Sequence, residues 1–193
     1  MRLILSHRIL FLCIFMCNSI SVFSQLRSEL KVAPDKVFSA MIKYAEKEDS
    51  VNLIKSMKHI DPLLIRFQQQ YDRDFKLIIK EDLKEGSSSD VLIVINDLIY
   101  TDIIDILNGV KNGEIETNKG VWIKIAYKDY VLISPYVVSV DNGFEQDRLL
   151  KNNFHKLMSI HSSESGYLSN GENSNINSDL LTIMIELLRK CMS

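Results

Sequence analysis

Residues 90–111 constrain the fold most, because their apolar residues recur at the period of an α-helix over the whole segment. At about 100° per residue, these apolar residues fall within one narrow stripe: Leu92, Ile95, Ile99, Ile103, Ile106 and Val110. The segment is rich in β-branched residues, but a strand of roughly twenty residues would far exceed ordinary strand lengths. The pattern therefore predicts a long amphipathic helix that ends at Asn112–Gly113.

Helical spacing continues through most of the chain, which has only seven glycines and three prolines in 193 residues. Asp61–Pro62 is typical of a helix start, with a capping residue followed by proline in the first turn. Similar apolar periodicity marks the segments 34–45, 51–57, 75–83 and 144–158. The sequence thus predicts an all-α bundle of about six helices, followed by a tethered, amphipathic C-terminal helix.

Residues 121–133 fit two structures. Apolar residues alternate with Lys124 and Lys128, which suits a strand. However, Trp122, Ile125 and Ile133 also share one helical face, with both lysines opposite. The helical neighbours and the lack of a partner strand favour a helix, and a strand is the alternative. Ser134–Pro135 then marks either a new helix start or a kink.

The first 24 residues have the pattern of a secretory signal peptide. Arg2 and Arg8 precede an uncharged run at 9–17, and Val22-Phe23-Ser24 offers a cleavage site. Nine apolar residues cover about 13 Å as a helix, whereas a bilayer core is about 30 Å thick. We therefore expect cleavage after Ser24, a periplasmic or secreted location, and no stable membrane span afterwards. The alternatives are an uncleaved anchor and a misassigned start.

The remaining chain divides at changes in composition. Residues 25–33 are predicted as an N-terminal linker and residues 34–161 as the helical domain. Residues 162–177 are rich in serine, asparagine and glycine with little to bury, so they predict a flexible linker. Residues 178–193 form the predicted C-terminal helix, which Ser178 would cap. This helix either docks on its own bundle or is presented to another protein.

Charge and cysteine content restrict the function. Removing residues 1–24 takes away two of the 23 basic residues and none of the 25 acidic ones, which leaves a net charge of about −4. A strongly basic nucleic-acid binder is thereby excluded. Two of the three cysteines leave with the signal, so Cys191 is alone and cannot form an intrachain disulfide. This pattern favours a bacterial periplasmic protein over a eukaryotic extracellular module.

The sequence contains no recognisable catalytic, metal or cofactor motif. The histidines that remain after cleavage have no His-x-x-x-His spacing, and neither Gly-x-Ser-x-Gly nor a phosphate-binding glycine loop occurs. Asp97, Asp102 and Asp105 suggest a calcium site, but helical carbonyl groups are not free to act as ligands. These aspartates are therefore predicted to form a solvated acidic face.

Two polar residues interrupt predicted apolar faces. Asn96 falls close to the apolar stripe of residues 90–111, and Asp129 projects between the apolar residues of 121–133. Burying an unpaired carboxylate costs several kcal/mol, so Asp129 should have a partner, with Asn96, Tyr100 or Tyr130 as candidates. A structural tie between two helices is favoured over a ligand pocket or a proton-transfer site. The third alternative is that Asp129 reaches solvent.

These observations favour an exported, non-catalytic helical protein that binds another protein in the periplasm or at the cell envelope. The alternative is a small-molecule carrier or enzyme that uses a polar pocket formed by Asn96, Tyr100, Asp129 and Tyr130. A binding module should expose an apolar surface or groove. A carrier or enzyme should instead have a concave pocket where titratable groups converge.

Overall fold

The computed structural model describes residues 27, 30–86, 88–163 and 171–192. These residues form an all-α fold without strands, which confirms the predicted fold class. The predicted signal peptide, residues 1–24, lies outside the described residues. So does the middle of the predicted flexible linker, residues 164–170.

Two helices begin at a capping aspartate, whereas Asp61, which the sequence suggested as a cap, is itself the first residue of its helix and follows Ile60, which has no capping side chain. The two caps are Asp49 and Asp74, which accept hydrogen bonds from backbone N–H groups at 3.1 and 3.0 Å. The elements are α2 (Pro34–Glu46), α3 (Ser50–Met57), the short 3₁₀ helix η1 (Lys58–Ile60), α4 (Asp61–Tyr71), α5 (Phe75–Glu85), α6 (Ser88–Lys111), α7 (Lys119–Ser139), α8 (Gly143–Ser163) and α9 (Gly171–Met192).

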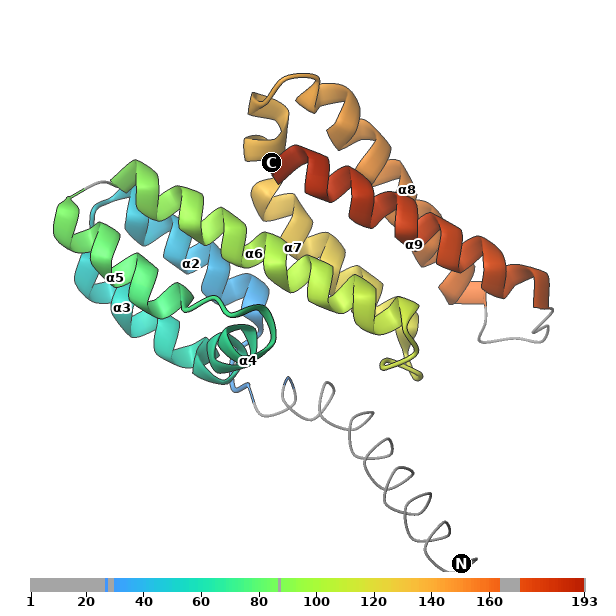
Figure 1. The fold of residues 1–193 in the computed structure, drawn as a ribbon, viewed down its shortest axis with the longest axis horizontal. Coiled ribbons are helices and arrows are strands. Elements are labelled where there is room, and N and C mark those ends of the chain that lie inside the picture. Colours follow the sequence, from blue (N-terminus) through green and yellow to red (C-terminus); the bar gives the residue numbers. More distant parts are fainter. Residues whose placement is uncertain (1–26, 28–29, 87, 164–170, 193) are drawn as a thin grey trace, which may run out of the picture.

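Helix α6 is the centre of the molecule (Figure 1). It packs against α2 and α5 on one side and against α7 and α9 on the other. The predicted stripe is buried as expected, with Ile95, Ile99, Ile103 and Ile106 all at 0% exposure. Because neighbours surround its second half, most residues between Leu98 and Val110 are buried, including polar ones. This helix therefore has little solvent-exposed face along that half.

Residues 121–133 are helical, so the strand alternative is wrong. They belong to α7, which continues through Pro135 to Ser139, so no new helix starts at Ser134. Ile123, Ala126, Ile133 and Val137 are buried along its inner face. Helix α7 lies against α6 and α8 and also contacts α2.

The C-terminal helix begins earlier than predicted. Helix α9 starts at Gly171 instead of Ser178, and α8 extends through Ser163, so both helices enter the segment predicted as linker. Helix α9 packs on α6 and α8 through Leu181, Met184 and Leu188, which are almost fully buried. Ile183, expected on the apolar face, is instead 50% exposed.

Candidate functional site

Asp129 is completely buried, as the helical projection predicts, but its neighbours are not those predicted. Neither of its oxygens accepts a hydrogen bond from an N–H or hydroxyl donor in the described part of the chain. Its polar neighbour is the carboxyl group of Asp102 on α6, which is also at 0% exposure. The projection gave the correct depth for Asp129, and the candidates Asn96, Tyr100 and Tyr130 were the wrong partners.

Arg27 brings a positive charge to this pair of carboxyl groups. Its Nη2 donates to Oδ1 of Asp102 in an ion pair, and the two side chains are 6% and 0% exposed. The guanidinium carbon also lies 5.7 Å from the ring centroid of Trp122 on α7, within the range of a cation–π contact. Arg27 belongs to the segment predicted as a linker, which thus contributes a buried side chain to the bundle.

The surroundings of Asp129 favour its protonated form. Burial disfavours the charged form of a carboxyl group, and a second negative charge nearby disfavours it further. Burial raises the pKa of Asp129 well above its usual range, the negative charge of Asp102 raises it further, and Arg27 opposes both effects. The cluster of Arg27, Asp102 and Asp129 joins the N-terminal segment, α6 and α7. With Asp129 in its neutral form, the cluster would have no net charge, which suits a structural tie.

A second buried ion pair lies one turn further along α6. Asp105 is 2% exposed and accepts hydrogen bonds from Nε and Nη2 of Arg66 on α4, both at 3.1 Å. The hydroxyl of Tyr71 donates to the same carboxylate at 3.0 Å. The predicted solvated acidic face is therefore wrong for Asp102 and Asp105, because α6 is central and arginines from distant segments reach both residues. Asp97 is partly exposed and pairs with Arg73 at 2.6 Å.

Tyr130 donates to a different carboxylate. Its buried hydroxyl lies 2.7 Å from Oδ1 of Asp147 on α8, and Ser134 donates to the same oxygen at 2.6 Å. Lys151 contacts the other oxygen at 2.8 Å. Burial raises the pKa of Asp147, but hydrogen bonds from Lys151, Ser134 and Tyr130 outweigh burial and lower it. This cluster ties α7 to α8, and the sequence analysis did not find Asp147.

The other two predicted site residues lie apart from Asp129. Tyr100 is partly buried near Arg189 of α9; burial raises the pKa of its hydroxyl, and the positive charge of Arg189 opposes that shift. Asn96 is partly exposed on α6. The four residues predicted as one polar pocket therefore belong to separate surroundings, and Tyr100, Asp129 and Tyr130 contact different charged partners.

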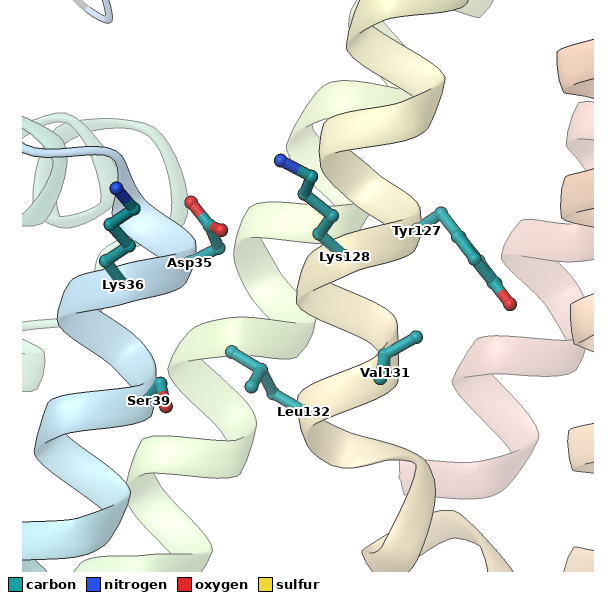
Figure 2. Close-up of a pocket in the computed structure, with 7 residues that line it drawn as sticks. All are labelled: Asp35, Lys36, Ser39, Tyr127, Lys128, Val131 and Leu132. Atoms are coloured by element: carbon teal, nitrogen blue, oxygen red, sulfur yellow. The ribbon is translucent and has the colours of Figure 1, made fainter.

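A groove of about 530 Å³ lies between α2 and α7, and its lining includes none of the residues of the predicted polar pocket. We call it the α2–α7 groove. Figure 2 shows Lys36 and Lys128 reaching toward one end, with Asp35 between them, while Leu132 points toward α2 further along. The groove is lined by Asp35, Lys36, Ser39, Tyr127, Lys128, Val131 and Leu132. Asp129 does not line it, so the groove does not support a pocket around that residue.

A smaller cavity of about 240 Å³ lies between α2, α3 and η1. Lys36 borders it as well, together with Lys55 and His59, over the apolar residues Val32 and Val37. Asp129 does not line this cavity either. Lysines therefore recur along both sides of α2, in a chain whose overall net charge is −2.

Within the described ranges, no group of three or more histidine, cysteine, aspartate or glutamate residues could hold a metal ion. No helix among these residues is both long enough and apolar enough to cross a bilayer. Comparison with models of known protein families, with curated proteins and with solved structures finds no match.

Proposed function

We propose that this protein is an exported, non-catalytic module that binds a helix of another protein along the outward face of α7. The observation that supports the proposal most is a row of exposed residues on this helix. We call the row the α7 stripe; its members are separated by three and four residues and comprise Val121, Lys124, Lys128, Val131, Pro135 and Val138.

The stripe is unusual because α7 is apolar on two faces. Its inner face packs in the core, yet Val121, Val131 and Val138 on the outer face are 57%, 47% and 40% exposed. Single exposed valines are normal on a protein surface, but here they repeat along one line of one helix. A helix with a second, partly apolar face often buries that face against another element as well. The exposed valines on the outer face of α7 therefore support a role for this face in binding another protein.

The spacing indicates what kind of partner fits. Alternating steps of three and four residues are the pattern by which one helix packs along another. Pairing with a second copy is disfavoured, because a two-fold axis at the middle of the stripe would bring the two Lys128 side chains together. The stripe contains no acidic residue that could compensate. A helix of a different protein avoids this repulsion.

The export part of the proposal comes from residues 1–24. Cleavage after Ser24 would leave Arg27 in the mature chain, so the buried cluster with Asp102 would be kept. Intact-mass measurement of the exported protein should show the loss of residues 1–24. A mass that retains them would contradict export by cleavage.

Site-specific photo-crosslinking tests the binding surface in the full chain. A photoreactive amino acid in place of Val131 should give one discrete product with another protein. The matched control is the same amino acid in place of Val51, a more exposed valine on α3. The product at position 131 should disappear when Val138→Asp is added, since that change places a carboxylate on the same stripe. Val138 is 40% exposed, so thermal melting should show that this variant remains folded.

Two results would contradict the proposal. Equal products from positions 131 and 51 would mean that the stripe has no special role. A product with twice the mass of the mature chain would assign the surface to a second copy of this protein.

A further inference from the structure

Building on the proposed function, we infer that the partner's helix is amphipathic and acidic, with carboxylates beside Lys36, Lys124 and Lys128 and apolar residues over the rest of the α7 stripe. The inference depends on how charge is distributed along the α2–α7 groove, which adjoins the stripe through Lys128 and Val131.

One end of the groove is cationic. Lys36 on α2 and Lys128 on α7 both reach toward this end, and Lys124 lies one turn further along the exposed face of α7. Asp35 neutralises part of this charge, which leaves a net positive end. The first turn of α2 adds to it, because Ala33 provides no side-chain cap for the backbone N–H groups there.

The other end is apolar. Helices α2 and α7 run in the same direction here, since Ser39 and Leu132 both lie below the lysines in Figure 2. Beyond Leu132, the exposed stripe continues with Pro135 and Val138 and has no charged member. A ligand that matches the whole surface must therefore be anionic at one end and apolar at the other.

The positive end excludes some partners. A basic amphipathic helix would place like charges beside Lys36 and Lys128 and would bind weakly. A helix without charge would cover the valines but leave the lysines partly desolvated and without partners. An acidic amphipathic helix would pair its carboxylates with the lysines and cover the valines with its apolar residues. The mature chain has a net charge of about −4, so this local positive surface contrasts with the rest of the molecule.

Three synthetic peptides of about 20 residues, long enough to follow α7, test the inference. All three carry the same leucines at three- and four-residue spacing, and the residues beside these leucines are glutamate, glutamine or lysine. Titration of the full mature chain, followed by calorimetry and by amide NMR shifts, should rank the affinities glutamate, then glutamine, then lysine. The largest shifts should map to residues 124–138 and to the first turn of α2.

Variants that each remove one lysine charge test which lysines bind the carboxylates of the glutamate peptide. Lys36→Gln and Lys128→Gln should each weaken the glutamate peptide about two- to five-fold, as expected for an exposed ion pair, and should leave the glutamine peptide unchanged. Lys84→Gln is the matched control, because Lys84 lies on α5, which packs against α3, α4 and α6. Raising the ionic strength from about 0.05 to about 0.5 M should weaken the glutamate peptide most.

The outcomes separate the inference from the proposed function. Equal affinity for the three peptides, with shifts along α7, would overturn the acidic partner and keep the helix-binding surface. No binding by any peptide would overturn both. Vesicles of anionic lipid that bind the protein more tightly than the glutamate peptide does, through the same residues, would assign the surface to a membrane and would also overturn the inference.

Discussion

Asp102 on α6 and Asp129 on α7 are both fully buried, and the negative charge of Asp102 adds to burial in raising the pKa of Asp129. Two like charges in a core are tolerated only when a cation and a proton compensate them. Arg27 supplies the cation, and the raised pKa of Asp129 favours its protonated form. We therefore expect the contact between α6 and α7 to depend on pH and on Arg27.

Asp129→Asn should make the unfolding free energy less dependent on pH. In the folded protein, burial raises the pKa of Asp129 above its ordinary value of 3.8. Between the ordinary and the raised pKa, the folded state therefore holds a proton that the unfolded state has released. The unfolding free energy consequently falls as pH rises through this range, by at most about 1.4 kcal/mol per pH unit. Asparagine can donate to Asp102 without a proton from solvent, which removes this loss.

Urea unfolding at several pH values between 4 and about 9 measures the effect. Asp129→Asn should equal or exceed the natural protein in stability at the upper end of this range. A natural protein that is more stable than the variant at high pH would mean that Asp129 is ionised in the core.

Arg27→Ala should destabilise the protein by about 3 kcal/mol, because it leaves the Asp102 charge buried without its ion-pair partner. The matched control is Arg148→Ala. Arg148 pairs with Glu145 at 2.6 Å, but the two side chains are 61% and 55% exposed, so solvent screens the pair and its loss should destabilise the protein far less than the loss of Arg27. Chemical unfolding of both variants measures the difference. Equal effects would show that residue 27 contributes little to the core.

These residues show which features of the site could be predicted from the sequence and which could not. Helical periodicity predicted the depth of Asp129 and Ile99, because both follow from the spacing along a single helix. It could not predict that Arg27 and Arg66 reach Asp102 and Asp105, since these contacts join segments that are 75 and 39 residues apart. For the same reason, the pattern of α6 suggested a solvated face where other helices cover it.

The candidate surface was missed for a related reason. Alternating apolar residues around Lys124 and Lys128 suggested a strand as an alternative, yet the same alternation reflects a helix with two apolar faces. The stripe from Val121 to Val138 has regular spacing that could have been found in the sequence. Its exposure could not, because exposure depends on where α2 and α8 pack beside α7.

Asp147→Asn should reduce the acid sensitivity of the protein. Hydrogen bonds from Lys151, Ser134 and Tyr130 lower the folded-state pKa of Asp147 despite its burial. Its contribution to stability is therefore present above the unfolded value of about 3.9 and is lost as pH falls through the folded pKa. Thermal melting between pH 2 and about 6 should show a smaller loss for the variant at low pH. An unchanged acid transition would assign the sensitivity to other carboxylates.

Gly143→Ala should destabilise the connection between α7 and α8. A Cβ atom on Gly143 would lie 1.9 Å from the backbone oxygen of Val137, so the backbone must move to accept it. Forcing extra atoms into a packed position typically costs about 1–3 kcal/mol. Gly113→Ala is the control: its added Cβ meets nothing within 4 Å, and the cost there is limited to the strain of φ +77°, about 1–2 kcal/mol.

The same substitution links stability to the proposed surface. Gly143 contacts the end of α7 that carries Val138, so a shift there should disturb the apolar end of the α7 stripe. Gly143→Ala is therefore expected to lower the melting temperature and, unlike Gly113→Ala, to weaken binding of the glutamate peptide at temperatures where both variants are folded. A melting temperature equal to that of the natural protein would contradict the close packing of this turn, and unchanged peptide affinity would separate the turn from the binding surface.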